Sequence, residues 1–234
     1  MSLDYDFIAS TAPIVLKALP MTVLLTVVPV TLGLLLGFIL ALFKIHRVPV
    51  LCQFASVYLS IFRGVPLLLM LFIAYYGLPK LLNILFFDGY RVMSPNKIPG
   101  VTAALIMLTL HSAAYLCEIV RGALGSVDMK QMEAAHAIGM TKLQAYTRII
   151  IPQAIVVCLP NYFNFVLGLL KKTSLVFTIA VMDIMTAAKI AAEEGYRFIE
   201  AYLLVGIIYI ICSFVLYSMF RCLEARAKRQ MGMY

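Results

Sequence analysis

Residues 18–43 read ALPMTVLLTVVPVTLGLLLGFILALF, without a single charged side chain. A helix needs about 20 consecutive apolar residues to cross the hydrocarbon core of a bilayer, and this run is long enough to do so. Uncharged runs recur further along the chain, at 98–117, 149–170 and 201–220. Because only helices and closed barrels can span a bilayer, these long runs predict an all-helical membrane protein.

The composition supports the same fold class. Hydrophobic residues make up 63% of the 234-residue chain and charged residues 13%, and the mean hydropathy is +0.99. A soluble domain carries about a quarter charged residues and could not hide so much apolar surface in one core. The net charge of +8 does not indicate nucleic-acid binding, because the Lys and Arg residues gather at the ends of apolar runs. The cysteines form no CxxC pair and the histidines show no ligand spacing, so no metal site is predicted.

A fifth span is expected within 48–87, where Arg63 interrupts the apolar sequence. Gly64 and Pro66 predict a kink or a break in this helix. We therefore expect a single transmembrane domain over residues 1–234. Its predicted spans are roughly 18–43, 52–80, 98–120, 153–177 and 200–220, with a polar loop at 123–152.

Five spans put the two termini on opposite sides of the membrane. With the N-terminus outside, more Lys and Arg residues fall at the inner ends of the spans than at the outer ends. Arg91 and Lys97 are among the residues on the outer side. By the positive-inside rule, the N-terminus is then outside and the C-terminus is cytoplasmic. This orientation places the polar loop in the cytoplasm.

The polar loop carries helix signals rather than the composition of a slack linker. Asp128 with Gln131, and Thr141 with Gln144, have the spacing of capping boxes. Gly139 suits the position just after the end of a helix. The loop is therefore predicted to hold two short helices with a glycine corner. An ordinary amphipathic helix lying on the membrane surface is the alternative.

The same loop matches a family motif. It resembles the "EAA" signature of ABC-importer permeases at Glu133, Ala134, Ala135, Gly139, Ile149, Ile151 and Pro152, with Ile151 where Leu is usual. Segments 60–79, 111–135 and 159–184 are similar to the polar-amino-acid subfamily of these permeases. The departures include Val65 in place of Thr and His111 in place of Asn.

The resemblance implies a type I ABC importer permease fold, with five transmembrane helices and a cytoplasmic coupling helix between the third and fourth spans. It also implies a second permease subunit, identical or paralogous, two cytoplasmic ATPase subunits and an extracellular or periplasmic substrate-binding protein. Such an assembly lies in the plasma (inner) membrane of a prokaryote. The implied ATPase-coupling residues are Glu133, Ala134, Ala135, Gly139 and Pro152.

The chain itself is expected to be a transport subunit and not an enzyme. It contains no G-x-x-x-x-G-K-[ST] sequence, whose backbone would hold the phosphates of ATP. ATP and Mg²⁺ are therefore expected on the partner subunits. A membrane-bound enzyme would need a catalytic cluster, and the sequence shows none that is convincing.

Polar residues within the fourth span are candidates for the substrate pathway, because polar groups inside a membrane are costly and mark functional sites. Lys171 and Lys172 either end the span and reach the outer headgroups, or lie deeper and face a watery cavity. Arg63 is either a structural ion-pair partner, for instance of Glu118, or a pathway residue. The predicted pathway residues are Asn164, Phe165, Gly168, Lys172, Thr173 and Ser174.

The resemblance also bears on the substrate. Family members often have Asp where this chain has Lys172, and some, including basic-amino-acid permeases, have Glu where it has Phe165. A cationic substrate needs carboxylate partners, so these replacements argue against one. Segment 177–202 is similar to permeases of cystine and related sulfur amino acids, which favours a polar, non-cationic substrate such as cystine. The alternative class, a gradient-driven secondary transporter or channel, would need acid relays or inverted repeats, and no clear repeat is visible.

Overall fold

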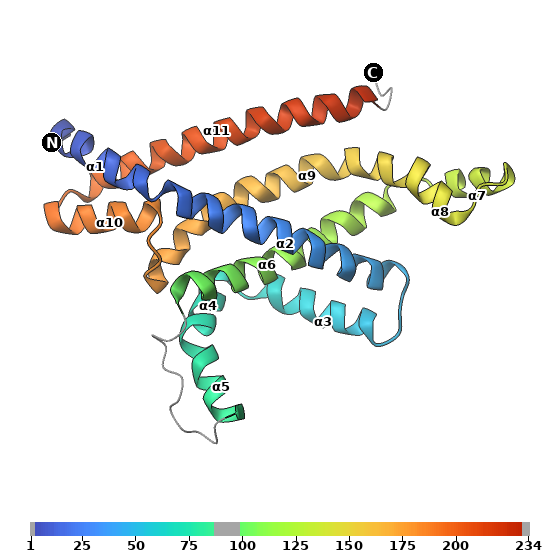
Figure 1. Cartoon of the computed structure of the whole chain (residues 1–234), viewed down its shortest axis with the longest axis horizontal. Helices are drawn as coiled ribbons and strands as arrows, with labels where there is room; N and C mark the ends of the chain where they lie inside the picture. Colours follow the sequence, from blue (N-terminus) through green and yellow to red (C-terminus); the bar gives the residue numbers. More distant parts are fainter. Residues whose placement is uncertain (1–2, 87–98, 231–234) are drawn as a thin grey trace.

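The computed structural model describes residues 3–86 and 99–230, and all regular structure in these residues is helical (Figure 1). The all-helical prediction is confirmed. The elements are α1 (Tyr5–Lys17), α2 (Leu19–Ile45), α3 (Leu51–Gly64), α4 (Leu67–Phe72), η1 (Ile73–Gly77), α5 (Leu78–Phe86), α6 (Gly100–Gly125), α7 (Lys130–Ala137), α8 (Lys142–Ala145), η3 (Tyr146–Ile150), α9 (Ile151–Lys172), η4 (Thr173–Ile179), α10 (Ile184–Gly195) and α11 (Phe198–Gln230). Five segments of the described residues are long and apolar enough to cross a membrane: Tyr5–Ile45, Leu67–Leu85, Gly100–Gly125, Lys142–Ile179 and Phe198–Arg229.

Helices α2, α6, α9 and α11 run roughly along the long axis of the molecule, and α2 packs closely on α6 (Figure 1). Gly33 and Gly37 of α2 face α6. A Cβ built on Gly37 would lie 2.8 Å from the carbonyl oxygen of Ala113 and from the amide nitrogen of Cys117. No real Cβ approaches backbone so closely, so the two helices reach this separation because the position is glycine.

Replacing Gly37 by Ala is expected to destabilise the α2–α6 pair by about 1–3 kcal/mol, the usual cost of overpacking a tight contact. The measurement is the thermal unfolding midpoint of the protein purified in detergent. Gly206→Ala on the exposed face of α11 is the matched control, because a Cβ added there meets nothing within 4 Å. Equal midpoints for the two variants would contradict the close approach.

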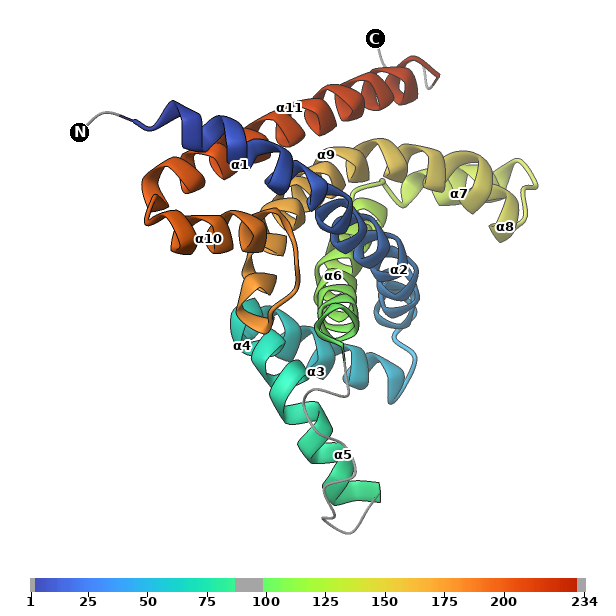
Figure 2. The same ribbon diagram turned by 60° about the vertical axis from the view of Figure 1, so that its left-hand side comes forward.

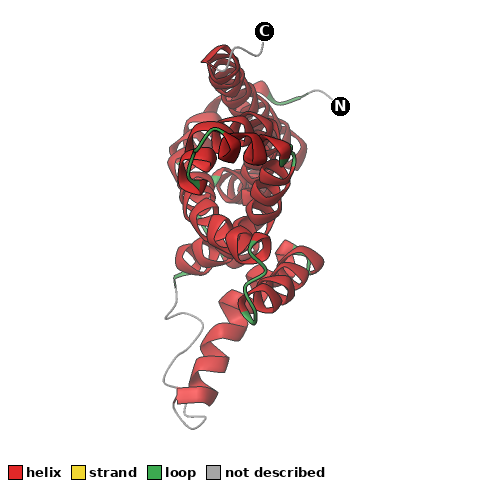
Figure 3. Cartoon of the chain, turned by 90° about the vertical axis from the view of Figure 1, so that its right-hand side faces the viewer, coloured by secondary structure: helices red, strands yellow, loops and turns green. Residues whose placement is uncertain are grey.

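The predicted second span, 52–80, is divided in the structure. α3 ends at Gly64, Val65 is extended with φ −92° and ψ 134°, and α4 begins at Leu67. The break arises because Pro66 has no N–H to donate and disfavours helical geometry at the residue before it. The predicted break is confirmed, but its two sides differ in direction. α3 lies along α2, whereas α5 leaves the bundle sideways (Figures 2 and 3).

Three predicted spans are shorter than the helical segments that contain them. The first lies within Tyr5–Ile45, the fourth within Lys142–Ile179, and the fifth within Phe198–Arg229. α11 alone has 33 residues. At 1.5 Å per residue this is about 50 Å, so α11 extends beyond a bilayer core of ~30 Å. Arg91 and Lys97, together with the predicted start of the third span at residue 98, lie outside the described residues.

The two ends of the molecule differ in what they carry. At one end α1, α10 and the first turns of α11 pack around Val15, Ile184, Ala188 and Ala201, close to the N-terminus. The opposite end holds α7, α8 and the C-terminus (Figure 1). The polar loop and the C-terminus therefore lie on one side of the molecule, and the N-terminus lies on the other.

Candidate functional site

The polar loop folds into a compact element, which we call the α7–α8 turn (residues 129–145). Its own small core contains Met132 and Ala135 of α7, Ala145 of α8, Ile150 of η3 and Ala154 of α9. Ala135 is only 2% exposed, because it is the point where α7 meets this core. α7 is therefore fixed to the beginning of the fourth-span helix and does not hang from a linker.

The outward side of the turn is exposed and partly apolar. Glu133, Ala134 and Gly139 are exposed. Ile138 and Leu143, on either side of the glycine corner, are 78% and 73% exposed. Two large apolar side chains exposed on a polar element are candidates for contact with a partner. Neither residue was predicted to be functional from the sequence, although apolar residues in a polar loop were a visible signal.

The corner of the turn has the predicted chemistry. Thr141 Oγ1 accepts from the Gln144 N–H at 3.3 Å, and Gln144 Oε1 accepts from the Thr141 N–H at 2.9 Å, which completes the predicted capping box. Gly139 has φ +83°, in the left-handed region that glycine adopts without strain, and it directly follows the C-cap residue Ile138. The glycine corner is therefore confirmed.

The other predicted capping box, at Asp128, is wrong. Asp128 Oδ1 accepts from the Lys130 N–H at 2.9 Å, and α7 begins without a side-chain cap. Gln131, which the box requires, is engaged elsewhere. Its side-chain amide and that of Gln153 on α9 donate to each other, with 3.2 Å between Gln131 Nε2 and Gln153 Oε1. A reciprocal amide pair therefore joins α7 to α9.

The second predicted short helix is the beginning of a much longer one, because α8, η3 and α9 are continuous. Pro152 lies inside this helix, where it gives the backbone no N–H. The adjoining π-helical stretch η3 accommodates the loss, since the Ile151 N–H donates to Tyr146 O, five residues back. Gln153 Nε2 also donates to Ile149 O at 3.1 Å. The proline, the π-helical stretch and the bond to α7 therefore lie within about two turns of helix.

Replacing Gln153 by Ala is expected to loosen α7, because a part-buried Gln131 left without its partner costs about 1–3 kcal/mol. Amide hydrogen exchange of α7 should become faster, while exchange in α6 stays unchanged. Gln53→Ala, at an exposed position of α3, is the matched control. Identical exchange in α7 for both variants would show that the amide pair does not hold the turn.

A cluster of charged and aromatic side chains lies between α3, α6 and α9. Lys172 Nζ lies 3.2 Å from His111 Nε2 and 5.0 Å from the centre of the Tyr115 ring. Arg63 Cζ lies 5.6 Å from the same centre, and the Phe165 ring stacks on Tyr115 with 5.8 Å between centroids. The cluster brings together three predicted residues, Arg63, Phe165 and Lys172. It adds His111 and Tyr115, which the sequence analysis did not assign to the pathway.

α9 ends at Lys172, and the depth of Lys171 and Lys172 in the membrane stays a prediction. α9 passes directly into η4 after Lys172. The Lys172 ammonium is turned towards α6, whereas Lys171 is exposed. The two neighbouring lysines therefore have different surroundings.

The remaining predicted pathway residues do not join the cluster. Asn164 is exposed, and a Cβ added at Gly168 would meet nothing within 4 Å. Thr173 is buried and Ser174 is half-buried. Their hydroxyls donate to the backbone carbonyls of Leu170 and Lys171 at the end of α9, each at 2.7 Å. Asn164 and Gly168 therefore lie at an open surface, and the hydroxyls of Thr173 and Ser174 are used in hydrogen bonds to the backbone.

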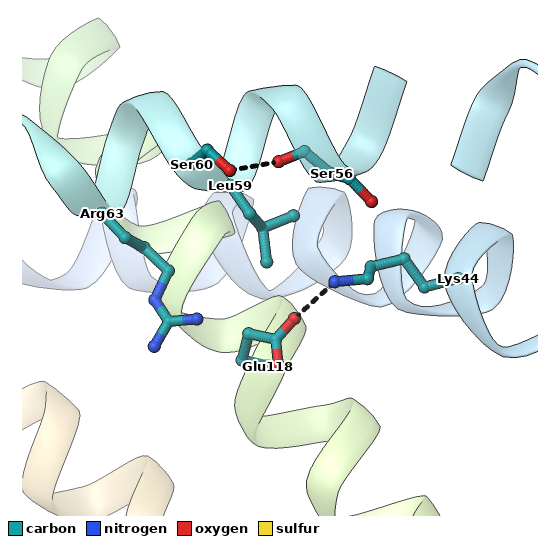
Figure 4. Close-up of a pocket in the computed structure, with 6 residues that line it drawn as sticks. All are labelled: Lys44, Ser56, Leu59, Ser60, Arg63 and Glu118. Carbon is teal, nitrogen blue, oxygen red and sulfur yellow. Dashed lines mark hydrogen bonds and ion pairs between the residues drawn. The ribbon is translucent and has the colours of Figure 1, made fainter. Parts of the chain in front are cut away.

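Glu118 lies about one turn beyond Tyr115 on α6. Its Oε1 accepts from Lys44 at 2.9 Å, and its Oε2 accepts from Arg121 at 2.6 Å. The suggested ion pair between Arg63 and Glu118 is absent, because two other cations already hold this carboxylate. All the same, these side chains border one cavity of about 340 Å³, which is lined by Lys44, Ser56, Leu59, Ser60, Arg63 and Glu118 (Figure 4).

Known proteins resemble the chain over nearly its whole length. The family model of the binding-protein-dependent transport system inner membrane component matches residues 33–229. The chain is 43% identical over 226 residues to "Probable amino-acid permease protein YxeN" of Bacillus subtilis (strain 168), covering 97% of this chain and 96% of that protein. It is 36% identical over 226 residues to the L-cystine transport system permease protein TcyL of the same strain, covering 97% and 92%.

The fold has a solved counterpart. A crystal structure of an amino acid ABC transporter with histidines matches with a TM-score of 0.83 and 33% sequence identity, covering 97% of this chain and 100% of that chain. The chain belongs to the family of binding-protein-dependent transport system inner membrane components, as a multi-pass, non-catalytic permease subunit of an ABC importer for polar amino acids, with ATP bound by the partner ATPase.

Proposed function

We propose that the chain forms one transmembrane domain in the plasma (inner) membrane of a prokaryote, with the N-terminus outside. The α7–α8 turn and the C-terminus then lie in the cytoplasm. The distribution of Lys and Arg supports this orientation, and the arrangement of the helices supports a common side for the turn and the C-terminus. Lys and Arg are more frequent at the ends assigned to the inside. The turn and the C-terminus also lie at the same end of the molecule (Figure 1).

In this proposal the α7–α8 turn docks on a cytoplasmic ATPase subunit. The observation that carries it is the pairing of an exposed apolar tip, Ile138 and Leu143, with a rigid attachment to the fourth-span helix. Glu133 and Ala134 lie on the exposed side of α7, where a partner groove can reach them. A movement of the ATPase then turns α7, and the Gln131–Gln153 pair passes the movement to the helix that contains Pro152.

The complete importer contains a second permease subunit, identical or paralogous, two ATPase subunits and an extracellular or periplasmic binding protein. The charged side chains of Arg63, Lys172 and Glu118 support the need for a second permease subunit. They would be costly against lipid, so the surface that carries them must turn towards water or towards another subunit. A pathway between two permease subunits provides both.

The proposed substrate is a polar, non-cationic amino acid of the cystine type. Two cations, Arg63 and Lys172, lie over the Tyr115 ring, and the cluster around that ring contains no carboxylate. Phe165 adds an apolar face to the same place. A carboxylate group of the substrate suits this cluster, whereas a cationic side chain would be repelled. TcyL, a relative at 36% identity, is named for L-cystine transport.

Vesicles that contain the assembled importer, its binding protein and internal ATP test the substrate proposal. Uptake of labelled L-cystine is expected to exceed that of L-arginine by at least about tenfold, because like charges in contact cost several kcal/mol. Binding of both amino acids to the isolated binding protein is the control that separates its selectivity from that of the permease. Arginine uptake equal to or above cystine uptake would contradict the proposal.

A further inference from the structure

One face of α6 is polar along the middle of the helix. His111, Tyr115 and Glu118 are spaced by four and three residues, so they lie on the same side, and they extend over about 10 Å. Lys172 of α9 binds the first, two cations lie over the second, and Lys44 of α2 binds the third. The cluster around Tyr115 and the cavity beside Glu118 are therefore parts of one continuous polar surface.

The cavity at the Glu118 end of this surface carries more positive than negative side chains. Lys44, Arg63 and Arg121 surround a single carboxylate, whose two oxygens are already engaged. In the part of the chain that the structure describes, the Arg63 guanidinium contacts the Tyr115 ring but has no hydrogen-bonded acceptor or ion-pair partner. A guanidinium presents a planar fork of donors that matches a carboxylate or a phosphate. Arg63 is exposed, and an oxyanion is the kind of partner that its guanidinium fits.

The cavity also suits the other charged group of an amino acid. The hydroxyls of Ser56 and Ser60 donate to backbone carbonyls of α3 at 2.9 Å. Their oxygen lone pairs remain available as acceptors for an ammonium group. A volume of about 340 Å³ is enough for the main-chain part of an amino acid. The cations Arg63 and Lys44 and the hydroxyls of Ser56 and Ser60 around the cavity together fit a zwitterion (Figure 4).

We propose that this cavity is an inner binding site, where Arg63 and Lys44 bind the α-carboxylate of the transported amino acid after it leaves Lys172. Because Arg63 and Lys172 lie over the same aromatic ring, the carboxylate passes from one cation to the next without crossing an apolar stretch. The proposal rests on the importer function, but it depends only on the carboxylate that all amino acids share. A phospholipid phosphate has the same oxyanion chemistry, and the test must distinguish it.

The test uses the assembled importer in two sets of vesicles, one of phosphatidylcholine and one that also contains phosphatidylglycerol. The probes are labelled L-cystine, L-glutamine and L-arginine, so that uptake is measured with whichever probe is carried. Arg63→Gln is expected to lower ATP-driven uptake of the carried probe by about tenfold or more in both lipid mixtures, the usual effect of losing a charge-assisted hydrogen bond. Arg63→Lys keeps the charge and should restore part of the uptake.

The matched control is Arg226→Gln, the same substitution at an exposed position near the end of α11. Co-purification of the ATPase shows that each variant is folded and assembled.

Uptake by an assembled Arg63→Gln complex equal to that of Arg226→Gln would overturn the inner site. A loss that depends on phosphatidylglycerol would identify a lipid site and also overturn it. An assembled Arg63→Lys complex no better than Arg63→Gln would contradict a role for the charge. If the wild type carries glutamine but not cystine, the substrate proposal alone fails.

Discussion

Replacing Gly139 by Val is expected to abolish co-purification of the ATPase while leaving the membrane helices folded. Gly139 has φ +83°, and a β-branched residue at such an angle costs about 1–2 kcal/mol or more, so the corner between α7 and α8 must rearrange. The same corner positions Ile138 and Leu143. A Cβ added at Gly139 meets nothing within 4 Å, so the change acts through the backbone and not through a clash.

Two further variants sharpen this prediction. Gly206→Val places the same side chain at an exposed helical glycine of α11 and should leave ATPase binding intact. Gly139→Asn should retain part of the binding, because Asn tolerates left-handed geometry better than other residues. ATPase binding to Gly139→Val at the wild-type level, measured by affinity purification from membranes, would remove the docking role from the turn.

Replacing Lys172 by Gln is expected to lower ATP-driven amino-acid uptake by about tenfold or more, since the substrate carboxylate loses a charge-assisted partner. Lys171→Gln should transport like the wild type, because Lys171 is exposed and Lys172 alone binds His111. The two substitutions are chemically identical and one position apart, so a difference between them reports the direction in which each lysine side chain points. The measurement is the initial uptake rate of labelled L-cystine into vesicles.

An equal loss of uptake in both lysine variants would mean that transport depends on positive charge at the end of α9 and not on the contact of Lys172 with α6. Lys172→Arg provides a second comparison. It retains the cation and is expected to transport better than Lys172→Gln. An arginine variant as inactive as the glutamine variant, with the ATPase still bound, would contradict a simple role for the charge.

The membrane helices were predictable because the bilayer imposes a strong rule, namely that a span tolerates few charges over about 20 residues. The direction change after Pro66 was not. The sequence is apolar on both sides of the break, so its pattern shows where the helix stops but not where α5 goes. Helix lengths were underestimated for a related reason. α11 continues past the bilayer through charged residues, which are compatible with either a helix or a loop, so the sequence does not show where the helix ends.

The α7–α8 turn was predictable where its chemistry is local. Gly139 and the Thr141–Gln144 box involve residues close in sequence, and both were found. Gln131 has the right spacing for a capping box with Asp128, but its amide binds Gln153 instead, a residue 22 positions away. A tertiary contact therefore overrode a local preference, and no single-sequence pattern could have shown which would prevail.

The charged cluster was only half predictable. Arg63, Phe165 and Lys172 stand out as departures from apolar or family patterns, whereas Tyr115 looks like any aromatic residue of a membrane helix. The ion-pair partners of Glu118 could not be predicted from the sequence either. Three cations lie near this carboxylate, and only Lys44 and Arg121 bind it. Arg63, which also lines the cavity, is the cation that does not reach Glu118.

The most direct test of the account is ATP-dependent uptake by the assembled importer in sealed vesicles. Uptake of the amino acid held by the binding protein should require internal ATP, both ATPase subunits and an intact glycine corner in the α7–α8 turn. Uptake that runs on an ion gradient at the same rate without ATPase subunits would contradict the central claim.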